Sequence, residues 1–417
     1  MHDAGLKTGA TLAAWARPPE AGANFLPYGR QLIEADDLAA VAAALTSDLL
    51  TTGPKVEAFE SALARATGAR EAVVCANGTA ALHMALRAAG LRPGEACIVP
   101  AITFVATANA VAFEGADVVF ADVDPGSGLM TPQTLSDAIT RAAGRRIRAI
   151  LPVHLRGDAC AMPALKRLAD EAGAVVIEDA CHALGVRTPW GPIGSNVHAA
   201  MSCFSFHPVK TITTGEGGAV TTNDLHLAAE LRRARNHGVE RQVARFRIVD
   251  EAFTGAQANP WWYEQHELGW NYRLADMNCA LGLSQLAKLE RFAARRRMLY
   301  SLYADRLAPL APFVTVAPMA SDDTACPHLM SVLLDFAALK VSRTEVAARL
   351  RGRGIGSQVH YIPVHWQPFW RARQPDLTLP GAEAWYRCTL SLPLYPSMAD
   401  GDVERVACAL EAAIGHA

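Results

Sequence analysis

One stretch of the chain decides how it folds and what chemistry it can carry: Ser205-Phe206-His207-Pro208-Val209-Lys210-Thr211-Ile212-Thr213-Thr214-Gly215-Glu216-Gly217-Gly218. An apolar run at residues 201–206 predicts a strand before this stretch, and its glycine-rich end predicts a turn where backbone can approach another group closely. Lys210 lies between the strand and the glycines. In an uncharged pocket, desolvation lowers the pKa of a lysine, so that its free amine can attack an aldehyde. The alternative for this segment alone is a solvated loop lysine.

The region around this stretch alternates short apolar runs with helix-like segments. Such alternation is typical of crossover units that build a mostly parallel sheet, buried on both faces. The fold class is therefore α/β. We expect strands at residues 72–76, 97–100, 118–123, 149–153, 175–177, 201–206 and 219–222, and helices at 79–89, 103–114 and 162–172.

The chain of 417 residues is long enough for a large domain and a smaller one. An Arg- and Leu-rich helical pattern at 276–307 leads away from the sheet. A strand near 329–334, a helix near 343–351, an extended segment at 358–363 and a helix near 402–414 follow. We divide the chain into an N-terminal extension (1–26), a large domain with its entry segment (27–275), and a connecting helix with a small C-terminal α/β domain (276–417).

Composition excludes several classes of protein. The net charge of −2 provides no basic field for nucleic acid or anionic lipid. No apolar run reaches the roughly 18 residues that a membrane helix needs, and the first 26 residues lack the apolar core of a signal peptide. The nine cysteines form no CxxC pair, so we expect core thiols in a reducing compartment and a cytoplasmic protein.

A carboxylate is expected at the end of a buried strand in Val175-Val176-Ile177-Glu178-Asp179-Ala180-Cys181-His182. Ligand sites of open α/β sheets lie at this edge. Neighbouring side chains of a strand point to opposite faces, so Asp179 or Glu178 can serve a ligand there, but not both. A helix cap is the alternative role for Asp179.

The sequence also contains a segment suited to phosphate and several histidines and cysteines that a metal could bind. Asn77-Gly78-Thr79 follows a strand and opens a helix, where backbone N–H groups and the helix dipole suit a phosphate, although an ordinary N-cap has the same pattern. His360 and His365 share neither a helix face nor a strand face, and Cys181-His182 and Cys203…His207 lack zinc spacing. We expect no metal site.

Taken together, these motifs resemble the DegT/StrS family of nucleotide-sugar aminotransferases, which are fold-type I enzymes dependent on pyridoxal 5′-phosphate (PLP). The family order is a Gly-Thr phosphate loop, Glu-Asp-Ala-x-His/Gln, and Ser-Phe-x-x-x-Lys followed by Thr-x-x-Glu-Gly-Gly. All three occur here in that order, and the resemblance runs from about Pro27 to the C-terminus.

Within the family the chain is most similar to the transaminases of pseudaminic acid biosynthesis. These aminate C4 of a UDP-linked 2-acetamido-2,6-dideoxy-4-keto hexose with L-glutamate as donor. The stretches that carry this resemblance are 27–31, 47–54, 100–109, 206–210 and 359–365. A transaminase for another nucleotide 4-keto sugar, linked to GDP or to a UDP-pentose, is the main alternative.

The resemblance also implies roles for particular residues. Lys210 would form a Schiff base with PLP and move the proton, while Asp179 would pair the pyridine nitrogen. His182 and Phe104 would lie beside the ring. Asn271 would reach the phosphate from the neighbouring subunit of a homodimer. Residues implied to hold the phosphate are Gly78, Thr79 and Ser205; residues implied to line the UDP-sugar site are Tyr28, Asp48, Leu49, Leu50, Thr51, Gln358, Val359, His360 and Tyr361.

The chain departs from the family pattern at several places. Leu155-Arg156-Gly157 stands where Phe/Tyr-Ala-Gly is usual, and Cys75-Ala76-Asn77 replaces Ser-Ser or Asn-Ser. Ala275 and Asn278 replace Thr/Asn and Gln, and residues 240–262 form a longer polar loop. Sugar dehydratases of the family lack the lysine, so Lys210 argues against that activity. An intact Lys–Asp pair argues against a regulatory PLP-binding module.

Overall fold

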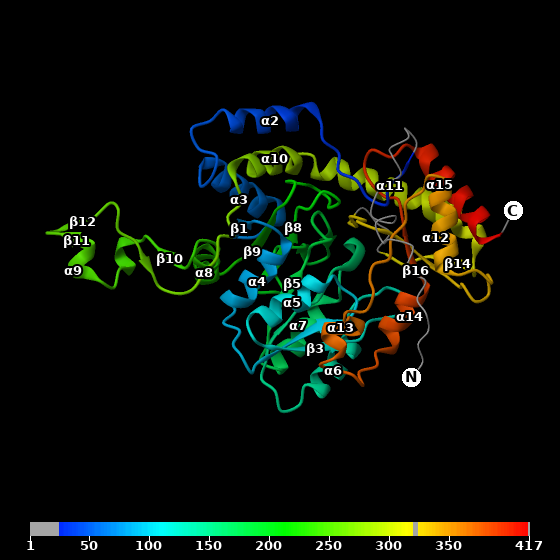
Figure 1. Ribbon diagram of the computed structural model, residues 1–417, viewed down its shortest axis with the longest axis horizontal. Coiled ribbons are helices and arrows are strands. Elements are labelled where there is room, and N and C mark those ends of the chain that lie inside the picture. The colour runs from blue at the N-terminus through cyan, green and yellow to red at the C-terminus, as the bar shows by residue number, and fades with distance from the viewer. Residues whose placement is uncertain (1–24, 320–323, 416–417) are drawn as a thin grey trace, which may run out of the picture.

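A computed structural model describes residues 25–319 and 324–415 of the chain (Figure 1). Its centre is a seven-stranded sheet with the order β1-β9-β8-β5-β4-β2-β3, in which only β9 runs antiparallel to its neighbours. The predicted α/β class and mostly parallel sheet are thus confirmed. The strands are β1 Glu71–Cys75, β2 Ala96–Pro100, β3 Asp117–Ala121, β4 Ile147–Ile150, β5 Val175–Asp179, β8 Met201–Ser205 and β9 Gly218–Thr222.

Helices cover both faces of this sheet, as its apolar strands require. Three were predicted from the sequence within about two residues, namely α4 Gly78–Ala88, α5 Val105–Phe113 and α7 Met162–Glu171. The helices α6 Pro132–Arg141 and α8 Leu225–Arg235, and the entry helices α2 Ala35–Leu45 and α3 Pro54–Thr67, were not predicted. Most of the sequence between strands is therefore helical.

Strand register brings distant motifs to one edge of the sheet. The carboxyl ends of the parallel strands share that edge, and because β9 is antiparallel, its first residue lies there too. Gly218 pairs with Ser205 on one side and with Cys75 on the other, while Asp179 pairs with Cys203. The ends of β1, β5 and β8 and the turn before β9 therefore meet in one place.

The predicted long helix over 276–307 is wrong in one respect, because it consists of two helices. These are α10 Asp276–Leu286 and α11 Leu289–Leu307. Between them Lys288 leaves helical geometry, with φ −101° and ψ 0°, and its ammonium lies 2.6 Å from Asp36 Oδ1 and 2.7 Å from Asp37 Oδ1. The break therefore coincides with the attachment of the entry segment.

The C-terminal part forms a second core around a three-stranded sheet of β14 Val314–Val316, β15 Met330–Leu334 and β16 Thr389–Leu392. Helices α12 Arg343–Gly352 and α15 Asp400–Ile414 pack there, close to their predicted bounds. The segment between β15 and β16 also contains α13 Pro368–Arg371 and α14 Pro380–Cys388. Its buried side chains Val364, Trp370 and Trp385 belong to the core around the central sheet, so this segment ties the two cores together.

An arm extends from the body of the molecule at the end of α8 (Figure 1). Its base is the pairing of β10 Val239–Glu240 with β13 Glu264–Gln265, and its tip contains α9 Val249–Ala252, β11 Phe253–Thr254 and β12 Gln257–Ala258. It coincides with the stretch expected to be a long polar loop. No helix in the described residues is long and apolar enough to span a membrane.

Candidate active site

A cavity of about 680 Å³ opens at the edge of the central sheet where the motifs meet. The start of α4, the start of α5, the end of β5 and the β8–β9 turn line it from the large domain, and residues 358–362 line it from the C-terminal part. Its volume falls within the range of small-molecule and cofactor sites. The site is therefore built by segments that are far apart in the sequence.

Lys210 reaches this cavity from the β8–β9 turn. Burial lowers the pKa of its ammonium, and the nearby Cys181 and Asp179 only partly oppose that effect. A lysine amine whose pKa is lowered is a better nucleophile at neutral pH. The turn itself is tight, since a Cβ on Gly218 would lie 2.4 Å from Asn77 O.

Asp179 also lines the cavity, and both of its carboxylate oxygens accept hydrogen bonds. Thr107 Oγ1 donates to Oδ2 at 2.7 Å, and the Cys181 N–H donates to Oδ1 at 3.1 Å. Thr103 Oγ1 lies 2.7 Å from Thr107 Oγ1 and extends this series of hydrogen bonds. These bonds fix the orientation of a buried carboxylate that faces the cavity, where it suits a cationic ring nitrogen.

Glu178 serves a different network, on the opposite face of β5. Its Oε1 lies 3.6 Å from His154 Nε2, a distance too long for a good hydrogen bond, and its Oε2 accepts from the Ser202 hydroxyl. Ser202 Oγ in turn lies 2.8 Å from Asn196 Oδ1. Of the two neighbouring carboxylates, Asp179 is the one that faces the cavity, as the strand alternation requires.

The start of α4 forms a cradle beside Ser205. Asn77 caps the helix by accepting from the Ala80 N–H at 2.8 Å. Among the described residues, the N–H groups of Gly78 and Thr79 have no hydrogen-bond partner in the chain. A Cβ on Gly78 would lie 2.9 Å from Ser205 Cβ and 3.3 Å from Cys181 Sγ. Free N–H groups at a helix start and a close approach that only glycine permits are suited to a phosphate.

The aromatic residues expected beside a cofactor ring lie on the side of the cavity towards residues 358–362. His182 Nε2 lies 3.2 Å from Tyr361 Oη, with the two rings stacked at 6.1 Å. The ring of Phe104 lies 6.1 Å from that of Tyr361 and is exposed at the mouth. Burial, with Lys210 and His360 nearby, holds the pKa of His182 well below its usual range. The imidazole is therefore neutral.

Residues 358–361 and Tyr28 line the same cavity from another side. The rings of Tyr28 and His360 lie 5.4 Å apart, and His360 Nδ1 lies 2.8 Å from Ser391 Oγ. Burial lowers the pKa of His360 to about 3. His365 is also buried, but it packs against Phe120, away from His360.

Two of the predicted binding segments do not line the cavity of their own chain. The loop at 48–51 follows α2, where Leu49 and Leu50 are exposed, and it is held by the bond from the Asp276 N–H to Leu50 O at 2.9 Å. Asn271 pairs with Asn236 in an isolated bridge. Both segments lie near the start of α10, because Thr51 forms a bridge with Ala275.

Several lining residues were not predicted from the sequence. Thr107 is the most informative, because its bond to Asp179 spans 72 positions. The signal available was a pair of threonines four residues apart in an otherwise apolar helix start. The other unpredicted lining residues include Thr103, Cys181, His207, Val209, Glu216 and Gln367.

Comparison with known proteins gives the geometry a context. The model of a family described as the DegT/DnrJ/EryC1/StrS aminotransferase family matches residues 31–411. Among solved structures, Helicobacter pylori PseC, described as an aminotransferase involved in the biosynthesis of pseudoaminic acid, is 27% identical with a TM-score of 0.84. The match covers 94% of this chain and 99% of that one.

Two further structures are similar over nearly the whole chain. DesV of S. venezuelae, solved in complex with a ketimine intermediate, is 33% identical with a TM-score of 0.80, covering 92% of this chain and 95% of that one. A putative sugar aminotransferase of Streptococcus pneumoniae, solved in its PMP form, is 25% identical with a TM-score of 0.81, covering 94% and 98%.

Proposed function

The chain belongs to the DegT/DnrJ/EryC1/StrS aminotransferase family, and on that premise we propose that it moves the amino group of L-glutamate to C4 of a UDP-linked 2-acetamido-2,6-dideoxy-4-keto hexose. Members of the family are PLP-dependent sugar aminotransferases, so the chain is an enzyme and PLP is its cofactor. The observation that carries the reaction is the pair Lys210 and Asp179 in one cavity.

The residues at the cavity fit this cofactor. When bound, PLP acts as an electron sink for the carbon that gains or loses the amino group. In the proposal the free N–H groups of Gly78 and Thr79, with the Ser205 hydroxyl, hold the phosphate. Asp179, oriented by Thr107, would hold a proton on the ring nitrogen. Phe104 and His182, which line the cavity, would restrict the position of the ring.

Lys210 is the group that moves protons at the substrate carbon. Burial lowers its pKa and so raises the fraction of the amine that is free at a given pH, and the free amine is the form that accepts a proton. The neutral His182 and the buried His360 add no positive charge beside that amine. The site is therefore arranged so that the proton acceptor next to the reacting carbon is a lysine.

The proposal also specifies the sugar that accepts the amino group. Support comes from Tyr28 and residues 358–361, which line the same cavity as Lys210, and from the similarity to a pseudaminic acid aminotransferase over 94% of the chain. Overall identity does not decide between acceptors, since DesV is 33% identical and PseC 27%. A pocket of buried polar groups discriminates by leaving them unpaired around a wrong ligand, which costs more than a missing methylene.

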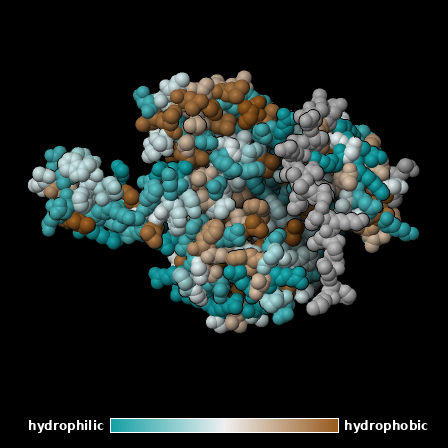
Figure 2. Space-filling view, viewed as in Figure 1, coloured by the Kyte–Doolittle hydropathy of each residue, from teal (hydrophilic) through white to brown (hydrophobic). Residues whose placement is uncertain are grey.

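The proposed active unit is a homodimer with shared sites. Asn271 and residues 48–51 do not line their own cavity, and both lie near the start of α10, so a second copy is the partner whose cavity they would complete. Figure 2 shows a hydrophobic patch over α2 on this side of the molecule. The exposed apolar side chains in this region are Leu38, Leu45, Leu49 and Leu50. A patch of this kind is typical of a protein–protein interface.

The acceptor is tested by a competition among nucleotide 4-keto sugars with glutamate as donor. The UDP-linked 2-acetamido-2,6-dideoxy-4-keto sugar of L-arabino configuration is expected to have the highest kcat/KM. Its gluco-type epimer, a UDP-4-keto-pentose and GDP-4-keto-6-deoxymannose are the competitors. If the GDP sugar is preferred, the acceptor assignment is wrong while the transaminase chemistry stands.

A further inference from the structure

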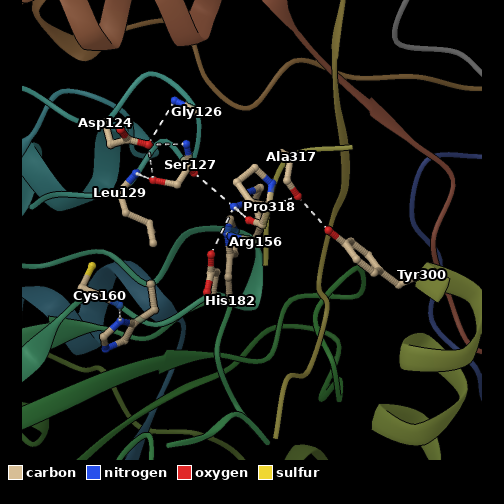
Figure 3. Close-up of polar contacts among 12 residues, drawn as sticks. Asp124, Gly126, Ser127, Leu129, Arg156, Cys160, His182, Tyr300, Ala317 and Pro318 are labelled. Carbon is tan, nitrogen blue, oxygen red and sulfur yellow. Dashed lines mark hydrogen bonds and ion pairs between the residues drawn. The ribbon is translucent and has the colours of Figure 1, made fainter. Parts of the chain in front are cut away.

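The loop after β4 contains a buried arginine that the proposed chemistry does not use. Arg156 has no exposed surface, and its backbone lies at φ 65° and ψ 5°, a left-handed conformation that bulky residues rarely adopt. Figure 3 shows its guanidinium among oxygens of several segments. It donates to Pro318 O at 2.9 Å and to Ser127 O at 3.2 Å, and it lies 3.3 Å from Asp158 Oδ2. These bonds anchor the strained turn.

The main chain of the same residue touches the wall of the cavity. The Arg156 N–H donates to His182 Nδ1 at 3.4 Å, and its carbonyl oxygen accepts from the His328 N–H at 2.8 Å. The rings of His182 and His328 lie 4.4 Å apart. The turn therefore holds His182 by one ring nitrogen and positions the histidine that packs against it.

The guanidinium is also linked, through Trp385, to the segment of the cavity wall that contains His360 and Tyr361. It lies over the ring of Trp385, 5.5 Å from the centroid, and Trp385 Nε1 donates to His360 O at 2.9 Å. His360 directly precedes Tyr361, whose hydroxyl contacts His182. Arg156 is therefore connected to both members of the His182–Tyr361 pair.

The hydrogen bonds of His182 determine where its proton lies. Nδ1 accepts from the Arg156 N–H, and the ring is neutral, so the single proton is on Nε2. Nε2 then donates to Tyr361 Oη, which must direct its own hydrogen elsewhere. In residues 25–319 and 324–415 no other hydrogen bond to Tyr361 Oη is found, and this side chain lines the cavity. The tyrosine hydroxyl is free to donate to a ligand.

We propose that Arg156 is a positioning residue whose anchored turn keeps His182 as the Nε2–H tautomer and thereby directs the Tyr361 hydroxyl to donate into the cavity. The ligand group that fits is an oxygen acceptor, anionic or carbonyl. The identity of that ligand rests on the proposed function, whereas the tautomer does not. Asp179 and the arginine turn thus act on the same site, one through a carboxylate and the other through the Tyr361 hydroxyl.

The tautomer can be read directly by long-range ¹H–¹⁵N NMR of the full-length holoenzyme labelled with ¹⁵N-histidine, in the absence of sugar substrate. The His182 signals are assigned by their loss in His182→Gln. The wild type is expected to show a neutral ring protonated at Nε2. A His182 ring protonated at Nδ1, or at both nitrogens, overturns the proposal whatever the acceptor sugar is.

Two variants test the role of the arginine. Arg156→Ala removes the side-chain bonds that anchor the turn, so both tautomers of His182 are expected, with kcat lowered on the order of tenfold and bound PLP retained. Arg156→Gly adopts the turn without strain. Its kcat and its fraction of the Nε2–H tautomer are therefore expected to lie between those of Arg156→Ala and wild type. If both variants keep the wild-type His182 spectrum, the proposal fails.

A matched control and a coupling test separate positioning from general stability. Arg343 likewise binds main-chain oxygens, of Tyr386 and Thr389, and lies 4.3 Å from the Tyr386 ring centroid, but it does not line the cavity. Arg343→Met should leave the His182 signals unchanged. Arg156→Ala and Tyr361→Phe should have non-additive effects on kcat, because one acts through the other; additive effects overturn the relay.

Discussion

Thr107 donates a hydrogen bond to Asp179 at 2.7 Å, although the two residues lie 72 positions apart, on α5 and at the end of β5. The bond satisfies a buried carboxylate oxygen and fixes the plane of the carboxylate towards the cavity. The Cys181 N–H holds the other oxygen at 3.1 Å. The orientation of Asp179 therefore depends on how α5 packs across the edge of the sheet. Substitution of Thr107 tests this dependence.

Thr107→Val removes this donor while keeping the shape of the side chain. A hydrogen bond to a charged group is worth about 1.5–3 kcal/mol, so PLP affinity should fall by about tenfold or more. The change can be measured by titrating the apoenzyme with PLP and following absorbance. Thr107→Ser keeps the hydroxyl and serves as control. Unchanged affinity in the valine variant would mean that the Cys181 N–H alone orients Asp179.

Asp179→Asn tests the charge itself, since asparagine is nearly isosteric but cannot hold a protonated ring nitrogen. Turnover should fall on the order of a hundredfold or more, and by a larger factor than PLP affinity. Steady-state kinetics at saturating PLP give the turnover number, and a PLP titration gives the affinity. Glu178→Gln, which alters the neighbouring carboxylate on the opposite face of β5, is a control for position. A rate near that of wild type in Asp179→Asn would assign the ring nitrogen to another group.

Parts of this site could be predicted from the sequence because they depend on local signals. Apolar runs fixed the strands, glycines fixed the turn around Lys210, and strand alternation separated Asp179 from Glu178. The Thr107 contact and the arginine turn could not be predicted, because each depends on how segments far apart in the chain pack together. The break between α10 and α11 has the same origin, since Lys288 binds Asp36 and Asp37 of the entry segment.

Lys210→Ala removes the amine that, in the proposed function, binds PLP and moves the proton. Turnover should fall below about one thousandth of wild type, because proton transfer by a positioned side chain contributes up to about 10⁴-fold and the covalent attachment is lost as well. PLP should still bind, but without a covalent bond. Borohydride treatment followed by peptide mass spectrometry checks this: wild type should carry PLP on the peptide that contains Lys210. PLP trapped on the variant chain would refute the assignment.

Gly78→Ala tests the cradle at the start of α4. The added Cβ would lie 2.9 Å from Ser205 Cβ, so α4 or the end of β8 must shift. Overpacking of this kind costs about 1–3 kcal/mol, and we expect about tenfold weaker binding of PLP. Gly401→Ala is the control, because Gly401 lies inside α15 with open space around its Cβ position. Gly144→Ala would not serve, because Gly144 has a positive φ. Inorganic phosphate should compete with PLP less well in Gly78→Ala than in wild type.

The last prediction tests the proposal that two subunits share their active sites. Asn271 does not line the cavity of its own chain, so Asn271→Ala should impair a site whose Lys210 belongs to the other subunit. In a hybrid of Lys210→Ala and Asn271→Ala chains, one site carries both substitutions and the other carries neither. If the single variants are nearly inactive, an equal mixture with free subunit exchange should recover about one quarter of wild-type activity.

The control for this experiment pairs Lys210→Ala with Asp179→Asn, two residues that face the same cavity of one chain. Each site of that hybrid contains one defect, so no activity should return. Subunit exchange is verified in both mixtures by native mass spectrometry of chains with different tags. If exchange occurs and the Asn271→Ala mixture stays inactive, the shared site is refuted; if the control mixture also gains activity, Lys210 and Asp179 act in different chains. The same mixing experiment with Thr51→Ala in place of Asn271→Ala tests the loop at 48–51. Recovery of activity on mixing with Lys210→Ala would assign that loop to the partner's cavity.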